Sequence, residues 1–294
     1  DCWIDPSRPV ANALVTHGHA DHARGGHGRT VATPETLAIM ELRYQTRDGA
    51  LPVQYGETIR LPGEVDVTYV PAGHVLGSAQ IVLEYAGERV VVTGDYKRMP
   101  DPTCPPFEVV PCDVFVTEAT FGLPVFCHPP IEHEIAKLLE ARADHPDRCV
   151  LVGAYALGKA QRLIAELRAA GHTEPIYIHG ALEKMCRLYE SFGIDLGELR
   201  LVSDHAKDEM RGAIILCPPS ALNDRWSRRL PDPFPEVGLE IEGERGAIVL
   251  RPGYRIELTS GRTHTEIDVD VPLLPWAERP WHVVQRSVLN TCRH

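Results

Sequence analysis

The sequence predicts an α/β protein in which a sheet-rich first part is followed by a smaller unit of alternating strands and helices. Apolar or alternating runs separated by Gly and Pro indicate strands at residues 13–15, 65–70, 80–85, 89–93 and 113–117. Beyond residue 121, segments of helical spacing alternate with apolar strands, as is typical of a parallel α/β unit. The helices are expected at 131–143, 160–170 and 181–192, and the strands at 149–154 and 176–179.

A chain of 294 residues is long enough for about two domains. We expect a first part at residues 1–120 and an inserted α/β unit at 121–204. Residues 205–294 are expected to return to the first part, with a strand at 213–217 and an atypical tail that alternates in strand fashion from residue 238.

The composition excludes several classes of protein. The net charge is −11, which argues against nucleic-acid binding through overall charge and leaves only a local basic patch for that purpose. Eight cysteines never form a C-x-x-C pair, so we expect reduced and mostly buried thiols. The sequence contains no apolar run of membrane-spanning length, and its first residues do not resemble a signal peptide, so the expected location is the cytoplasm, away from membranes.

The most informative segment is His17-x-His19-x-Asp21-His22, which directly follows a short apolar run. Residues two apart on extended backbone point the same way, so His17 and His19 can face one ion. Asp21 and His22 then turn toward a second cluster. Neighbouring imidazole and carboxylate groups with open coordination positions suit zinc or a similar divalent ion. A polar surface loop is the alternative.

Two later residues strengthen the metal hypothesis. His74 and Asp95 each end or follow a predicted strand, and each has a glycine immediately before it. Glycine permits a close approach of the backbone at these positions.

With these residues in view, the sequence resembles the metallo-β-lactamase-fold nucleases of the β-CASP group, which includes Artemis-type enzymes. It resembles most closely the bacterial ligase-associated DNA exonucleases. The resemblance covers roughly residues 1–230. It is carried by WIDP (3–6), THGHADHARGGHG (16–28), PAGHVLGSAQ (71–80), TGDYKRMPDPTCPPF (93–107), CDVFVTEATFGLP (112–124), AYALGKAQRL (154–163), IHGALEKM (178–185) and CPPSAL (217–222).

The resemblance implies a fold and a set of metal ligands. The fold would be an αββα metallo-β-lactamase sandwich with an inserted β-CASP domain. His17, His19 and His74 would hold one ion, Asp21 and His22 the second, and Asp95 would bridge them. The expected cofactor is one or two Zn²⁺ ions, with Mn²⁺ as the alternative.

Two further residues, Asp5 and Glu118, have expected roles beyond metal ligation. Asp5 would orient ligands from behind the site, or would be a turn carboxylate before Pro6. Glu118 would assist a catalytic proton transfer together with Asp21, or would only orient His22.

A helix start is the candidate DNA-binding element. Gly158, Lys159 and Arg162 open an amphipathic helix, where exposed amides and cations form an anion site unless the helix start is merely solvated. Residues 148–187 contain six Lys or Arg and three Glu, a local excess of positive charge in an acidic chain.

The sequence departs from the family pattern toward its end. The family places a Ser-Asp-His-Ala-Asp segment and a late histidine after its Pro-Pro-Ser-Ala segment, and neither occurs after Ser220. Ser203-Asp204-His205-Ala206 precedes that point, and we interpret it as a coincidence. His264 has no assigned role.

The leading functional hypothesis is a metal-dependent DNA exonuclease of DNA repair. Its implied mechanism is attack by a metal-held hydroxide on the terminal phosphodiester, from 5′ to 3′ on single-stranded ends. The implied partners are DNA with a free end and, functionally, a DNA ligase and a helicase. The alternatives are an RNA-processing β-CASP ribonuclease and a non-catalytic, metal-stabilised nucleic-acid-binding module. The sequence alone leaves all three open.

Overall fold

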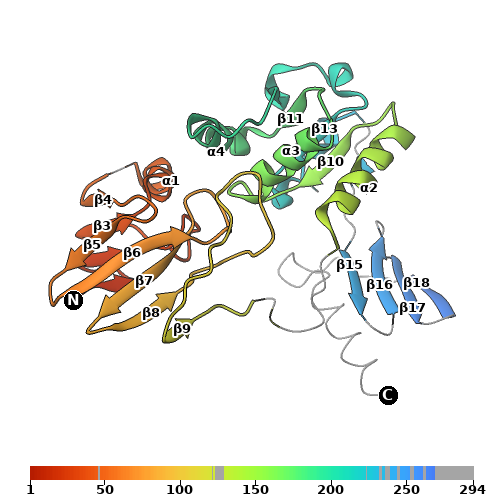
Figure 1. Ribbon diagram of the computed structural model, residues 1–294. Coiled ribbons are helices and arrows are strands. Elements are labelled where there is room, and N and C mark those ends of the chain that lie inside the picture. The colour runs from red at the N-terminus through yellow and green to blue at the C-terminus, as the bar shows by residue number, and fades with distance from the viewer. Residues whose placement is uncertain are drawn as a thin grey trace. The chain divides into compact units, whose positions relative to one another are not determined.

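The computed structural model describes residues 1–45, 47–120, 122, 129–222 and 224–231 fully. It also describes the backbone of five later strands (Figure 1). The sequence-predicted α/β class is confirmed, because parallel and antiparallel sheets occur together with helices. No helix in the described part of the chain is long and apolar enough to cross a membrane.

The first part contains two sheets and the helix α1 (Pro34–Tyr44). One sheet is parallel, in the order β1 (Trp3–Ile4), β2 (Asn12–Leu14), β3 (Arg29–Ala32) and β4 (Ala50–Pro52). The other has the order β5 (Thr58–Leu61), β6 (Val65–Pro71), β7 (Ala79–Tyr85), β8 (Glu88–Val92) and β9 (Val114–Val116), and it is antiparallel except for the β8–β9 pair.

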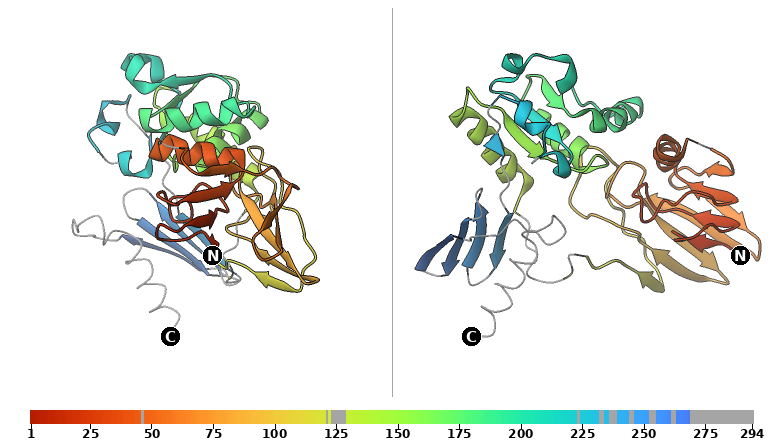
Figure 2. Two further views of the ribbon diagram at one scale, coloured as in Figure 1. Left: turned by 90° about the vertical axis from the view of Figure 1, so that its left-hand side faces the viewer. Right: turned by 180° about the vertical axis from the view of Figure 1, so that it is seen from behind.

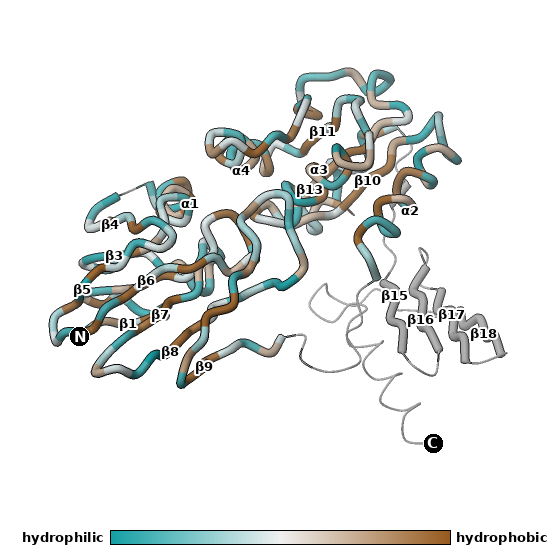
Figure 3. Tube along the Cα trace, viewed as in Figure 1, coloured by the Kyte–Doolittle hydropathy of each residue, from teal (hydrophilic) through white to brown (hydrophobic). Residues whose placement is uncertain are grey.

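The two sheets share one hydrophobic core. Leu14 and Val31 of the parallel sheet pack with Tyr69 and Ile81 of the mixed sheet, and all four side chains are buried. Figure 3 shows that the strands of the mixed sheet are largely apolar while the connecting loops are more hydrophilic. The short strands of the first part therefore derive their stability from packing between sheets, since apolar area removed from water is the main favourable term in folding.

The α/β unit is built on a five-stranded parallel sheet with three helices (Figure 2). Its strand order is β12 (Leu199–Leu201), β11 (Ile176–Ile178), β13 (Ile214–Cys217), β10 (Val150–Gly153) and β14 (Phe234–Pro235). Its helices are α2 (Ile131–Asp144), α3 (Lys159–Ala169) and α4 (Gly180–Ser191). Short 3-10 helices lie at Val202–Asp204, Lys207–Met210, Pro219–Ala221 and Ser227–Arg229.

This sheet extends beyond the boundary predicted at residue 204. β13 lies between β10 and β11 and pairs with both, and β14 adds to the far side of β10. The physical reason is that β13 is apolar and fully buried, so it needs a strand on each side to satisfy its backbone. Residues 205–217 therefore complete the α/β unit and do not return to the first two sheets.

The tail forms a sheet of its own. β15 (Leu239–Gly243), β16 (Gly246–Arg251), β17 (Arg255–Ser260) and β18 (Thr263–Asp268) pair in sequence order as an antiparallel meander. They belong to a compact unit separate from the one that contains residues 1–123 and 128–236. The strand-like alternation of the tail is confirmed. His264 lies on β18, where the structure describes only the backbone.

Candidate metal centre

The predicted ligands are positioned by the ends of the first two strands. β1 and β2 are parallel neighbours, so the chain leaves both at the same edge of the sheet. Asp5 directly follows β1, and Thr16 lies two residues beyond β2. The amide of Thr16 donates to Asp5 Oδ1 at 2.8 Å, which fixes the start of the histidine-rich loop against the end of β1.

Four of the predicted ligands converge. His17, His19, His74 and Asp95 each offer one ligand atom, and these atoms lie within 4.8 Å of one another. His74 Nε2 is 3.2 Å from His19 Nδ1, and Asp95 Oδ2 is 3.7 Å from His17 Nε2 and 3.6 Å from His74 Nε2. His74 lies 55 positions after His19 and Asp95 lies further along still, so the fold brings these two residues to the His17–His19 pair.

Hydrogen bonds behind the rings determine which nitrogens face the centre unprotonated. The Thr16 hydroxyl donates to Asp5 Oδ2 at 2.6 Å, so its 3.1 Å contact with His17 Nδ1 requires the proton on that nitrogen. His19 Nδ1 faces His17, so we assign the hydrogen bond between the His19 ring and the backbone of Leu157 to Nε2. His17 Nε2 and His19 Nδ1 thus meet at 3.0 Å with two lone pairs. A divalent cation between them removes this repulsion, and imidazole nitrogens are ligands that zinc prefers.

A second set of donors lies on the other side of Asp95. His22 Nδ1 donates to Asp5 Oδ2 at 2.8 Å, which leaves Nε2 facing Asp95 Oδ1 at 3.4 Å and Asp21 Oδ2 at 3.7 Å. The side chain of Asp21 is 75% exposed, whereas that of His17 is fully buried. Asp95 therefore presents one oxygen to each set, as a bridging carboxylate would. Asp21 lies on the solvent-exposed side of the centre.

Burial makes the three histidines of the first set good ligands. It lowers the pKa of His17 and His19, and it lowers that of His74 to about 4, with further lowering by His19 and Lys97. The rings stay neutral near neutral pH, as metal ligation requires. Burial also raises the pKa of Asp95, because the neighbouring positive charge does not offset the loss of solvent around this carboxylate.

Two glycines permit the close approach of the ligand loops, as expected. Gly73 has φ +71°, and a Cβ there would lie 2.4 Å from the Lys97 carbonyl oxygen. Gly94 has φ +57°, and a Cβ there would lie 2.6 Å from the Thr16 side chain. Any larger residue would push His74 or Asp95 away from the centre.

Glu118 lies near the centre, and its hydrogen bond among the described residues is local. Its Oε2 accepts the amide of Thr120 at 2.7 Å. Burial first, and then the negative charge of Glu118, raise the pKa of Asp95. The structure thus brings Glu118 within electrostatic range of the ligands, while Phe121 and Leu123, which follow it in the same motif, lie outside the described residues.

The predicted phosphate contacts lie at the start of α3, where their polar groups are already engaged. The Gly158 amide donates to Gln161 Oε1 at 2.9 Å, and the Arg162 guanidinium lies 3.5 Å from the carboxylates of both Asp101 and Glu166. The exposed-amide anion site expected from the sequence is therefore occupied by the protein's own acceptor.

Lys159 differs from its two neighbours in the predicted set. Its side chain is exposed, and its ammonium group lies 5.1 Å from the ring centre of Tyr155, which is also exposed. A cation beside an exposed aromatic ring is the combination that single-stranded nucleic acids bind. Among the three predicted residues, Lys159 thus has the side chain best placed to meet a phosphate.

Sequence reasoning named Asp5 behind the candidate ligands but missed Thr16 and Leu157. Thr16, which orients His17, precedes it directly, so its position was the available signal. Leu157, which orients His19, contributes only a backbone group, and no sequence pattern marks that. His205, by contrast, pairs with Glu209 at 2.9 Å and packs edge-on against Tyr177. The interpretation of its segment as a coincidence stays a prediction.

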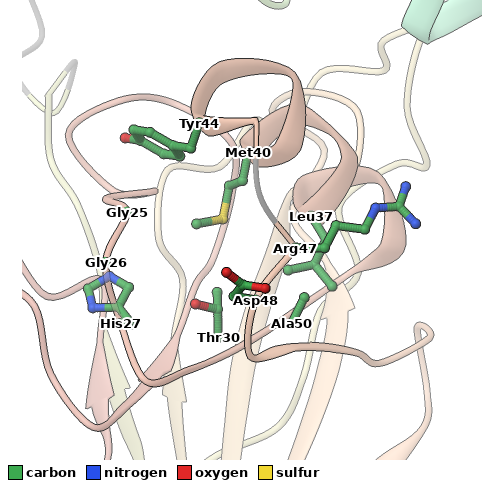
Figure 4. A pocket seen from close by; sticks show the side chains of 10 residues that line it. All are labelled: Gly25, Gly26, His27, Thr30, Leu37, Met40, Tyr44, Arg47, Asp48 and Ala50. Atoms are coloured by element: carbon green, nitrogen blue, oxygen red, sulfur yellow. The ribbon is translucent and has the colours of Figure 1, made fainter.

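A separate small hollow lies beside the histidine-rich loop (Figure 4). Gly25, Gly26 and His27 form one side, and residues of α1 and of the segment after it form the other. His27 Nδ1 accepts the Val10 amide at 3.2 Å. None of the converging metal ligands lines this hollow.

The chelator-treated protein is expected to lose stability as the pH falls from about 6.5 to about 4. A histidine with a lowered folded-state pKa binds its proton more readily when unfolded, so its contribution is present above the unfolded pKa and is lost as acid is added. The shift of His74 from 6.5 to about 4 corresponds to a loss on the order of 3 kcal/mol. Urea unfolding at pH 7.5 and 4.5 measures this, and equal free energies of unfolding would contradict it.

No family model matches the chain, but individual proteins do. It is 31% identical over 234 residues to a probable DNA ligase of Opitutus terrae, a match that covers 78% of the chain and 22% of the relative. It is 28% identical over 240 residues to the endoribonuclease YSH1 of Mycosarcoma maydis, covering 66% of the chain and 26% of the relative. A short match, 46% identical over 63 residues, joins 21% of the chain to 18% of a D-apiose dehydrogenase of Rhizobium rhizogenes.

The chain spans about a quarter of the length of the first two relatives. Those longer matches and the convergent histidines and aspartate point to the same group of proteins that the sequence motifs resemble. The chain belongs to the metallo-β-lactamase-fold nucleases of the β-CASP group.

Proposed function

We propose that the chain is a metal-dependent DNA exonuclease that shortens single-stranded ends from 5′ to 3′. The observation that carries the proposal is the meeting of unprotonated His17 and His19 nitrogens beside His74, with Asp95 between this set and His22. A divalent ion bound there would polarise a phosphoryl group and make water more acidic. The relative described as a probable DNA ligase favours DNA as the substrate.

The residues divide into roles under this proposal. His17, His19 and His74 hold one Zn²⁺ or Mn²⁺ ion, Asp21 and His22 hold a second, and Asp95 faces both. Asp21 stands at the exposed side, where a phosphodiester can reach it. Glu118, partly exposed and close to Asp95, is placed to accept or return a proton. Lys159 contacts the phosphate backbone.

The architecture that accompanies this function is an αββα metallo-β-lactamase sandwich with an inserted β-CASP domain. The shared core of the two sheets and the position of α1 support the sandwich. The parallel unit beginning after residue 121 supports the insert. The cellular setting we propose is DNA repair beside a ligase and a helicase.

RNA processing is the second candidate, because relatives described as endoribonucleases match with comparable identity. The 2′-hydroxyl contact that separates RNA from DNA depends on the substrate path, which the metal centre alone does not define.

A panel of four labelled substrates tests the proposal. We expect 5′-labelled single-stranded DNA to release labelled mononucleotide with added manganese or zinc, and 3′-labelled DNA to shorten gradually. Circular single-stranded DNA should resist, RNA should be cut slowly, and a chelator should stop all cleavage. Cutting of the circle would replace the exonuclease by an endonuclease. Faster cutting of RNA would favour the second candidate, and no cleavage despite bound metal would reject both.

A further inference from the structure

The loops that carry His74 and Asp95 contact helices α3 and α4 of the α/β unit. The amide of Leu76, two residues after His74, donates to the hydroxyl of the buried Tyr189 of α4 at 3.3 Å. Gly158, at the start of α3, lies so close to the same loop that a Cβ there would be 2.5 Å from the Val75 side chain. α3 and α4 thus rest directly on the His74 loop.

A buried carboxylate joins α3 to the Asp95 loop. The side chain of Asp101 is 4% exposed and lies 2.5 Å from Lys97 Nζ and 3.5 Å from Arg162 Nε. Its other oxygen accepts the amide and the hydroxyl of Thr103 at 3.0 and 2.6 Å. A buried carboxylate is costly unless it is paired, and here the two cations come from different elements. Lys97 lies two residues after Asp95, and Arg162 lies on α3.

The same helix start contacts a metal ligand. The His19 ring hydrogen-bonds to the backbone of Leu157, the residue just before Gly158. An outer hydrogen bond of this kind fixes the tautomer and the orientation of a metal-binding imidazole, and its loss typically lowers metal affinity about 10- to 100-fold. The position of α3 therefore sets the geometry of His19.

We propose that docking of α3 on the ligand loops controls metal affinity, with Asp101 as the positioning residue and the Leu157 backbone as the outer partner of His19. The coupling is reciprocal, so metal binding tightens the docking by the same free energy with which docking tightens metal binding. A nucleic-acid strand that displaced α3 would lower metal affinity. The proposal rests on the metal centre described above and not on which nucleic acid is cut.

Zinc affinity, measured by competition with a chromophoric chelator, tests the proposal. We expect Asp101→Asn to keep its shape and its Thr103 contacts but to weaken zinc binding about 10- to 100-fold, because Lys97 and Arg162 lose their shared counter-charge. Glu166→Gln is the matched control. It removes the other carboxylate beside Arg162, which belongs to α3 itself, and should change zinc affinity less than twofold.

Two further measurements keep the test decisive. Tyr189→Phe removes only the hydroxyl that accepts the Leu76 amide, and it should weaken zinc binding several-fold in a protein that remains folded. In the unaltered protein, zinc should slow hydrogen exchange both at Leu76 and in α3. A folded Asp101→Asn protein with unchanged zinc affinity, an equal loss in Glu166→Gln, or zinc-independent exchange in α3 would each overturn the proposal.

The outcomes separate this proposal from the proposed function. If the unaltered protein binds zinc and Asp101→Asn weakens it, the coupling holds even when no nucleic acid is cut. If the unaltered protein cuts DNA and Asp101→Asn binds zinc as tightly as before, the function holds and the coupling fails. If the unaltered protein binds no zinc or manganese, both the function and the coupling are rejected.

Discussion

Replacing Asp95 with asparagine is expected to reduce phosphodiester hydrolysis about a thousandfold or more while the protein remains folded. The Asp95 carboxylate faces both donor sets, with Oδ2 3.6 Å from His74 Nε2 and Oδ1 3.4 Å from His22 Nε2. Asparagine keeps the shape but removes the charge, and it offers an N–H group in place of one oxygen. Since burial raises the pKa of Asp95, loss of its charge should not lower the free energy of unfolding of the metal-free protein.

The measurement is kcat/KM on end-labelled single-stranded DNA together with zinc content by elemental analysis. Asp66→Asn is a suitable control, because Asp66 is an aspartate on β6 that pairs with Arg60 at 3.6 Å. It should retain full activity and metal. An Asp95→Asn protein with more than about a tenth of the original activity would have lost only about 1.4 kcal/mol of transition-state stabilisation, which is too little for a bridging ligand.

Asp21→Ala distinguishes the two donor sets. We expect it to abolish cleavage while leaving the ion of the His17, His19 and His74 set in place, because Asp21 faces only His22 among the ligands at 3.7 Å. Its 75% exposed side chain carries little folding energy, so the variant should unfold at the same denaturant concentration as the original protein. Retained activity would place substrate activation elsewhere in the centre.

The convergence of the candidate metal ligands could be predicted because the sequence signals that mark them are local or nearly so. His17, His19 and His22 lie within six residues in a loop that follows a buried strand, so their rings are close in space as well as in sequence. His74 and Asp95 were marked by the glycine before each, and both glycines adopt a left-handed conformation against a neighbouring loop. A site where two backbone segments approach closely requires glycine, and a glycine is visible in the sequence.

α1 was missed although its start carries clear signals. Thr33 caps the helix by accepting the Thr36 amide, Pro34 occupies the first turn and Glu35 follows. Its apolar residues, however, include the continuous run 37–40 and do not form a single stripe, so the helical periodicity is weak. Attention to the cap would have found it, and with it the helix whose residue Ile39 packs into the core of the α/β unit.

The sequence could not predict that the α/β sheet continues beyond residue 204, nor the role of Asp101. Both depend on tertiary contacts. The apolar run 213–217 reads the same whether it joins one sheet or another, and only its hydrogen bonds to β10 and β11 decide. Arg162 was predicted to meet phosphate because it follows Lys159 at a helix start. The buried carboxylate that engages it lies 61 positions earlier in the chain and follows no pattern that links the two.

Replacing Asp5 with alanine is expected to lower the free energy of unfolding by several kcal/mol and to weaken metal binding at the His22 side of the centre. The Asp5 carboxylate accepts the Thr16 amide, the Thr16 hydroxyl and His22 Nδ1 at 2.6–2.8 Å, and each buried group left without a partner costs about 1–3 kcal/mol. Asp5 also has φ +45°, which strains alanine but suits asparagine. Asp5→Asn should therefore lose less stability.

The penalty of Asp5→Ala in the chelator-treated protein should also depend on pH. The hydrogen bond that His22 Nδ1 donates to Asp5 raises the pKa of His22. The stability that this pair contributes is therefore present in full below the unfolded value of about 6.5, and it is lost as the pH rises through the higher folded value. The difference in free energy of unfolding between Asp5→Ala and the original protein should thus be larger at pH 5.5 than at pH 9. Urea unfolding at both pH values measures it. A penalty that is equal at the two pH values would show that Asp5 supports the Thr16 backbone alone, and a penalty below about 1 kcal/mol at both would remove Asp5 from the support of the centre altogether, because even one unpaired buried donor costs that much.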